Sequence, residues 1–170
     1  MAMASRTIVR MYLDALEFLE EEREAWAPFE ALADLSDVEL EQPVEAAHGW
    51  TGRDLMAHML AWQAVSLDVA RELAVGETSP TISRVDEDWD ARGGEVVNAE
   101  IQADWAALPL DELRARYRSQ PGELRGTLTV VPEARWIKHP THMSSFNQET
   151  IDHYREHAAD LEAILAAARS

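Results

Sequence analysis

Apolar residues recur at steps of three and four along most of the chain, and this spacing predicts amphipathic helices. The pattern indicates helices over residues 6–26, 51–75, 94–107, 110–128 and 144–168. The one β-like patch, residues 127–131, is too short to found a sheet. We therefore expect an all-α fold: a four-helix bundle in which a long crossover connection carries an extra helix, with residues 1–170 forming one domain.

Helix boundaries follow from capping and breaking residues. Thr51 and Asp54 fit a capping box at the start of the second helix, and Gly76 ends that helix. Ser144 or Ser145 is expected to cap the last helix. The polar segments 77–94 and 130–143 contain prolines and are expected to be connections, and Pro121-Gly122 is expected to interrupt the helix over 110–128. The run 20–24, rich in glutamate, predicts a solvent-exposed face.

Charge and composition exclude several classes of function. The 170 residues carry a formal net charge of −17, a field that repels nucleic acid and anionic membrane surfaces. The chain has no cysteine, so disulfides, thiolate metal sites and a protein thiol nucleophile are excluded. No N-terminal apolar run resembles a signal peptide, and no window is apolar enough to cross a membrane. We expect a cytoplasmic protein that acts on a small molecule.

Three histidines lie on the apolar stripes of two predicted helices. His153 and His157 are four residues apart and share one face, and His58 lies on the buried stripe of the second helix. The stripe around His157 also holds Phe146, Thr150, Leu161 and Ile164, with Tyr154 at its edge, whereas Glu149, Asp152, Arg155 and Glu156 point elsewhere.

Buried imidazoles need partners, and a shared metal ion is one that would satisfy several at once. Three imidazoles with an open fourth position form the catalytic type of zinc site, and imidazole also suits nickel or iron. The alternative is three core histidines, each hydrogen-bonded to a carbonyl or a carboxylate.

Other residues are weaker candidates. Trp62 is expected to be a core residue, with contact to a substrate as the second interpretation. Asn147 and Tyr154 lie one turn from the histidine pair, where they would orient a ligand or satisfy nearby hydrogen bonds. The remaining histidines, His48, His139 and His142, fall in predicted loops.

Two stretches resemble a known superfamily. Residues 49–62, Gly-Trp-Thr-Gly-Arg-Asp-Leu-Met-Ala-His-Met-Leu-Ala-Trp, are similar to the second-helix signature of DinB-like four-helix-bundle proteins. Residues 150–157, Thr-Ile-Asp-His-Tyr-Arg-Glu-His, are similar to the C-terminal helix signature of those proteins. Their spacing and the middle region 86–113 resemble the ClbS/DfsB-like branch. The resemblance implies a divalent metal held by one histidine of the second helix and two of the last, which map onto His58, His153 and His157.

The resemblance also implies classes of chemistry. The superfamily includes S-transferases and maleylpyruvate isomerases that use mycothiol, bacillithiol or glutathione, and the ClbS/DfsB-like branch is associated with self-protection by hydrolysis of a reactive ring. We therefore expect a zinc- or nickel-dependent enzyme that acts on a small electrophile, as a thiol-dependent transferase or a hydrolase. A low-molecular-weight thiol would be supplied from outside the chain. The alternative is a non-catalytic, stress-related binding or sequestering bundle with structural histidines. We also expect a homodimer.

Overall fold

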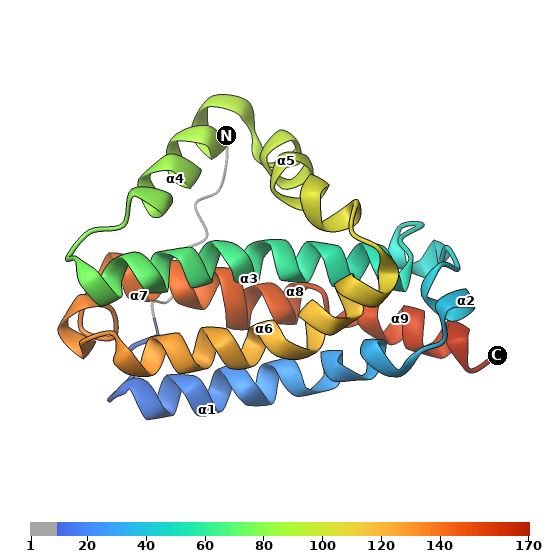
Figure 1. Cartoon of the computed structure of the whole chain (residues 1–170), viewed down its shortest axis with the longest axis horizontal. Coiled ribbons are helices and arrows are strands. Elements are labelled where there is room, and N and C mark those ends of the chain that lie inside the picture. Colours follow the sequence, from blue (N-terminus) through green and yellow to red (C-terminus); the bar gives the residue numbers. More distant parts are fainter. Residues whose placement is uncertain (1–9) are drawn as a thin grey trace.

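The computed structural model describes residues 10–170, and all regular structure within that range is helical. Figure 1 shows that the helices form a long bundle. The rods of this bundle are α1 (Ala15–Trp26), α3 (Gly52–Val75), α6 (Leu110–Val130) and a C-terminal rod made of α7 (Pro140–Asn147), η4 (Gln148–Asp152), α8 (His153–Glu156) and α9 (Ala158–Ala168). The expected all-α bundle is confirmed. None of the described helices is long and apolar enough to cross a membrane.

The first rod is shorter than the pattern predicts. Asp14 caps α1 by accepting a hydrogen bond from the Glu17 backbone N–H at 2.9 Å. Residues 10–14 are not helical, and the part of the predicted helix over 6–9 lies outside the described residues. Three short elements connect α1 to α3: η1 (Ala27–Asp34), α2 (Asp37–Leu40) and η2 (Glu45–Ala47). A fourth, η3 (Glu133–Arg135), precedes α7.

The helix α3 runs through the centre of the bundle and begins at the predicted capping box. The Asp54 carboxylate accepts from the Thr51 backbone N–H at 2.9 Å, and the Thr51 hydroxyl accepts from the Asp54 backbone N–H at 3.0 Å. Every residue from Leu55 to Gln63 is buried, because α3 is covered by other helices on all sides at this level. His58 therefore lies in the interior of the bundle.

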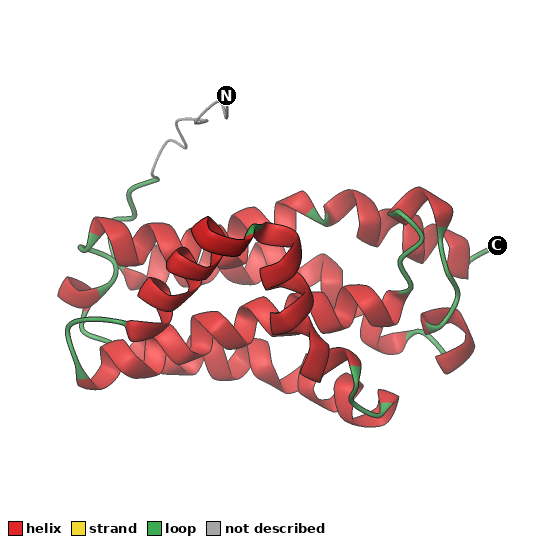
Figure 2. Cartoon of the chain, turned by 90° about the horizontal axis from the view of Figure 1, so that it is seen from above, coloured by secondary structure: helices red, strands yellow, loops and turns green. Residues whose placement is uncertain are grey.

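The crossover between α3 and α6 holds two helices where one was predicted. The helices α4 (Pro80–Arg92) and α5 (Gly94–Ala106) form an inverted V above α3, and Figure 2 shows that they lie over the middle of the bundle. The expectation of a connection over 77–94 is therefore wrong. Ser79 caps α4 with Pro80 at its first position, and the Glu72 carboxylate accepts from the Thr81 hydroxyl at 2.8 Å, which ties α4 to the end of α3.

The C-terminal rod starts earlier than predicted and is not a uniform α-helix. His139 caps α7, so the expectation that Ser144 or Ser145 caps this helix is wrong. The turns widen to π-helix over η4, and α8 ends at Glu156, one residue before His157. The other expected interruption, at Pro121, does not occur, because α6 continues through that residue.

One residue of the glutamate run is buried. Glu22 is 0 % exposed, so the prediction of a solvent-exposed face over 20–24 is wrong at this position. Its carboxylate accepts hydrogen bonds from Arg125 Nε of α6 at 2.5 Å and from the Tyr154 hydroxyl of α8 at 3.0 Å. These partners join three rods of the bundle, and they counter only part of the cost of burial, which raises the pKa of Glu22.

Candidate metal centre

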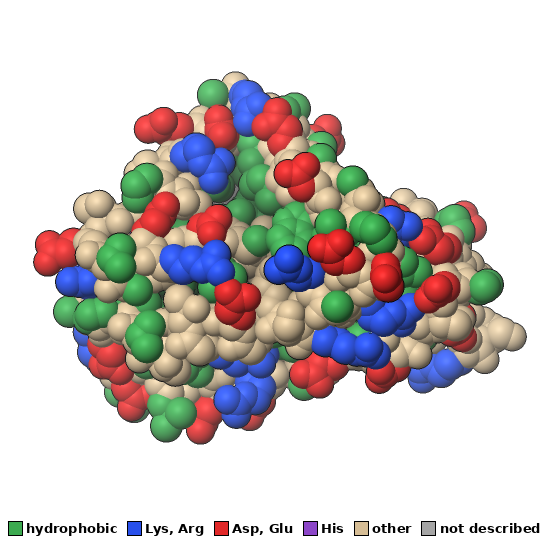
Figure 3. Space-filling view, viewed as in Figure 1, with side chains coloured by type: hydrophobic (Ala, Val, Ile, Leu, Met, Phe, Trp, Pro, Cys, Tyr) green, Lys and Arg blue, Asp and Glu red, His purple; other side chains and the backbone are tan. Residues whose placement is uncertain are grey.

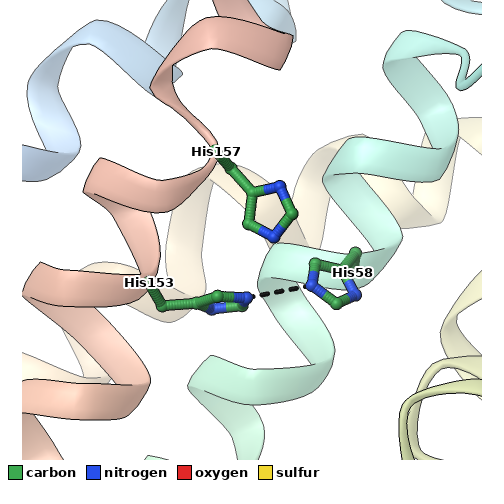
Figure 4. A group of neighbouring side chains, drawn as sticks. All are labelled: His58, His153 and His157. Carbon is green, nitrogen blue, oxygen red and sulfur yellow. Dashed lines mark hydrogen bonds between the residues drawn. The ribbon is translucent and has the colours of Figure 1, made fainter. Parts of the chain in front are cut away.

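The rod α3 and the C-terminal rod bring His58, His153 and His157 together inside the bundle. Figure 4 shows the three imidazoles facing one another. One ring nitrogen from each lies within 4.8 Å of the others, and His58 Nε2 is 2.9 Å from His153 Nε2. The structure therefore gathers the three histidines that the helical pattern singled out.

The irregular geometry of the C-terminal rod positions two of the three. The π-helical turns of η4 immediately precede His153, and π-helical turns occur often at functional sites. His157 lies between α8 and α9 with φ −94° and ψ 6°, in the sparsely populated bridge region. Its backbone N–H still donates to the His153 carbonyl at 3.2 Å, so both imidazoles remain on the side of the rod that faces α3.

Hydrogen bonds from outside the cluster select the tautomer of two histidines. His58 Nδ1 lies 3.2 Å from Gln102 Oε1, which α5 supplies, and His157 Nδ1 lies 2.9 Å from Asp160 Oδ2, one turn further along the chain. Both oxygens are acceptors, so each Nδ1 carries the proton and each Nε2 is left with a free lone pair. Metal-binding histidines are usually oriented in this way.

Burial keeps two of the imidazoles neutral. Removal from water, followed by the neighbouring imidazoles, lowers the pKa of His153 to about 2. Removal from water, followed by His157, lowers the pKa of His58 to about 4. Neutral imidazole is the form that binds metal, so both side chains are ready for a cation at neutral pH.

The donor set fits a divalent ion such as zinc or nickel. His153 Nδ1 is buried and has no hydrogen-bond partner among the described residues. Without a cation, the short contact between the two Nε2 atoms requires a proton on one of them, and a proton on His153 Nε2 leaves its Nδ1 as a buried acceptor with no donor. A cation would instead use one lone pair from each of the three rings. Three imidazole nitrogens and an open position are a usual zinc arrangement, and nickel accepts the same ligands.

A cavity of about 470 Å³ opens onto the three histidines from the side of α4 and α5. Trp62 and Trp89 form its aromatic walls, and the Trp62 indole N–H donates to Asn98 Oδ1 at 2.8 Å. Trp50 stacks on His157 with the ring centroids 5.6 Å apart. A small molecule in this cavity would lie against the histidines.

The structure places the weaker candidates differently. Trp62 lines the cavity, whereas Asn147 and Tyr154 do not. Tyr154 turns into the core, where its hydroxyl accepts from Gln63 Nε2 at 2.9 Å and donates to Glu22. Asn147 accepts from the Tyr12 hydroxyl at 2.9 Å, away from the histidines.

The other histidines also lie outside the cluster. His48 is exposed in a left-handed turn, as expected of a loop residue. His139 and His142 belong to the start of α7 rather than to a loop, and their rings stack on each other with centroids 3.7 Å apart. His142 is buried, with Nδ1 2.6 Å from the Arg135 carbonyl oxygen.

Two hydrogen-bond partners and most of the polar residues that line the cavity were not predicted as part of the site. Asp160 lies three residues after His157, a helical spacing that was available in the sequence. Gln102 comes from α5, and no local pattern links it to His58. Glu149 and Glu156 line the cavity, although a regular helical wheel directs them away from the histidines.

The fold and the cluster together define a DinB-like helical bundle with three histidines gathered beneath its crossover. A comparison with known protein families identifies the family within that class. The family described as the mycothiol maleylpyruvate isomerase N-terminal domain matches residues 19–162, and the chain belongs to this family. This confirms the expected superfamily, while the ClbS/DfsB-like branch stays a prediction. The comparisons with curated proteins and with solved structures gave no significant match.

Proposed function

We propose that the chain is a metal-dependent enzyme that joins a low-molecular-weight thiol to a small electrophile, with His58, His153 and His157 as the metal ligands. The convergence of three imidazole nitrogens within 4.8 Å, at the end of a cavity of about 470 Å³, carries the proposal. Membership of a family named for a mycothiol-dependent isomerase supports thiol chemistry. Hydrolysis, in which water replaces the thiol, is the second reaction that this site supports.

A divalent ion held by the three imidazoles would act as a Lewis acid and make a thiol or water a better nucleophile near neutral pH. Gln102 and Asp160 hold the imidazoles of His58 and His157 in the binding tautomer. Because the chain has no cysteine, the reacting sulfur must come from a second small molecule. Trp62 and Trp89 enclose the space in which the two molecules would meet.

Metal content tests the first half of the proposal. Protein purified without a histidine tag or chelator is analysed for metals, and its melting temperature is recorded with added zinc or nickel. One equivalent of metal per chain and a rise in melting temperature are expected. His153→Ala and His157→Ala should each remove both effects. The matched control is His139→Asn, which removes a histidine outside the cluster and keeps a side chain able to cap α7.

Turnover tests the second half. Zinc- and nickel-loaded protein is incubated with monochlorobimane and mycothiol, bacillithiol or glutathione, and conjugation is followed by fluorescence. Conjugation above the rate of His153→Ala is expected with at least one of the thiols. Metal binding without turnover on any electrophile, by conjugation or by hydrolysis, would favour the alternative of a non-catalytic binding protein. The absence of metal binding would contradict the proposal altogether.

A further inference from the structure

The cavity over the histidines is surrounded by acidic side chains from three elements. Asp86 and Asp90 come from α4, Glu149 from η4 and Glu156 from α8. No lysine or arginine is among the described residues that line this cavity. The cavity wall therefore carries acidic side chains and no basic ones. Under the proposed function, this cavity holds the substrate.

These four carboxyl groups have no partners within the described part of the chain. None of them takes part in an ion pair or a side-chain hydrogen bond with another residue between 10 and 170. Acidic residues elsewhere are in part paired, as Glu100 is with Arg92 at 2.7 Å, and in part free on the surface of the described chain. What distinguishes these four is that they line one cavity to which none of the described basic side chains contributes.

Glu149 shows how crowded these groups are. Burial, followed by the nearby carboxylates of Asp86 and Glu156, raises the pKa of Glu149 to about 8. A bound cation would relieve this repulsion and favour the ionised carboxylate. A second polar group in the same wall lacks a partner: His153 is 8 % exposed, lines the cavity and has an unpaired Nδ1.

The aromatic walls suit the same kind of ligand. Trp62 and Trp89 meet edge to face with the ring centroids 6.0 Å apart, and Trp89 remains 44 % exposed. Indole faces attract ammonium groups through their quadrupole. Figure 3 shows hydrophobic side chains in the hollow beneath α4 and α5, with charged side chains around it.

The cavity continues past two of the carboxyl groups. Asp86 and Glu149 also line a second chamber of about 370 Å³ between α4 and α7. That chamber has apolar walls from Val65, Ile82 and Val85 and hydroxyl groups from α7. A ligand with its cation between Asp86 and Glu149 would thus have room on both sides.

We propose that the site selects an elongated, amine-bearing substrate whose ammonium group lies between Asp86 and Glu149. One end of this molecule reaches the histidines, and the other extends along Val65 and Ile82. A carboxylate substrate of the same size is disfavoured, because it would meet four acidic side chains and no basic one. The inference rests on the proposed function for the reaction itself, but the binding preference is independent of a metal.

The test compares three probes of equal chain length: 1,8-diaminooctane, 1,8-octanediol and suberate. Their affinities are measured by calorimetry on the full chain, once with chelator and once with zinc. The diamine is expected to bind at least about tenfold more tightly than the diol, and suberate more weakly than either, because the carboxyl groups that line the cavity attract cations and repel anions. This order is expected in the metal-free protein as well.

Charge-neutral variants locate the site. Asp86→Asn and Glu149→Gln should each weaken diamine binding about threefold to tenfold and leave diol binding unchanged. The matched control Glu87→Gln removes an exposed charge from the same helix outside both chambers, and should change diamine affinity less than about twofold. Thermal melts establish that each variant is folded.

Equal affinity for diamine and diol would overturn the inference by showing that the cavity does not select a cation. An equal loss in Glu87→Gln would overturn it by showing that the net charge alone attracts the diamine. The two proposals fail separately. Diamine selectivity without zinc binding would remove the metal-dependent function and leave the cation site. Zinc binding and turnover without diamine selectivity would remove the cation site and leave the metal-dependent function.

Discussion

His153 contributes to the acid sensitivity of the metal-free protein, and His153→Leu should remove that contribution while the contribution of His58, whose pKa is also lowered, remains. Burial and the two neighbouring imidazoles lower the pKa of His153 to about 2, whereas a histidine in an unfolded chain titrates near pH 6.5. Below pH 6.5 the unfolded chain therefore binds a proton here that the folded chain does not. The stability contributed by neutral His153 is present above pH 6.5 and is lost as the pH falls towards 2.

The magnitude follows from linkage between proton binding and folding. Between pH 8 and pH 5, the shift of His153 costs the wild type about 2 kcal/mol of unfolding free energy. Glu149 acts in the opposite direction, because its pKa is raised to about 8 and its protonation stabilises the fold as the pH falls from 8 towards its unfolded value. The difference between wild type and His153→Leu at each pH isolates the contribution of His153.

Urea unfolding in the presence of chelator, at pH 8, 7, 6 and 5, measures this difference. The stability of wild type relative to His153→Leu should decline by about 2 kcal/mol across the series. The control His139→Asn should follow the wild type in parallel at all four values. A gap between wild type and His153→Leu that stays constant to within about 0.5 kcal/mol would refute the reasoning, since it would mean that His153 titrates alike in the folded and unfolded chain.

Four further substitutions test other parts of the account. Gln102→Ala and Asp160→Asn should each weaken zinc binding about tenfold to a hundredfold in calorimetric titrations, because the first removes the acceptor that orients His58 and the second replaces the charged acceptor of His157 with a weaker, neutral amide oxygen. Glu22→Leu should lower the unfolding free energy by about 3–5 kcal/mol in urea, because it leaves the Arg125 guanidinium without its buried partner. Gly52→Ala should cost about 1–3 kcal/mol, because the new Cβ would lie 2.7 Å from a leucine side chain.

The two substitutions that test stability, Glu22→Leu and Gly52→Ala, each have a matched control. Glu20→Leu removes an exposed charge from the same helix as Glu22 and should change stability by less than about 0.5 kcal/mol. Gly126→Ala adds a methyl group where nothing lies within 4 Å, and should stabilise α6 by about 0.5–1 kcal/mol. Unchanged zinc affinity in both Gln102→Ala and Asp160→Asn would contradict the roles given to these residues.

The bundle and the histidine cluster could be predicted because both depend on regular helical spacing. His58, His153 and His157 lie on apolar stripes, and a stripe has to face the core whichever way the helices connect. The helix α4 was missed because its buried apolar content is small, with Val85 as its one fully buried hydrophobic residue. The ties of its first turn to Glu72 come from tertiary structure.

The residues that surround the histidine cluster could not be predicted from helical spacing. A helical wheel with a constant rotation per residue assumes a regular α-helix, but the C-terminal rod is π-helical over η4 and its helix is interrupted at His157. The real directions of Glu149 and Tyr154 therefore differ from the ideal ones, towards the cavity for the first and into the core for the second. Gln102 reaches His58 only because α5 folds back over α3, which no local pattern encodes.

X-ray absorption at the zinc edge of zinc-loaded protein tests the central claim most directly. The account predicts one zinc per chain with three imidazole nitrogens at about 2.0–2.1 Å and one exchangeable ligand such as water. It also predicts that the imidazole signal is lost in His153→Ala and kept in His139→Asn. Zinc coordinated by oxygen alone, or a spectrum that His153→Ala leaves unchanged, would contradict the assignment of His58, His153 and His157 as its ligands.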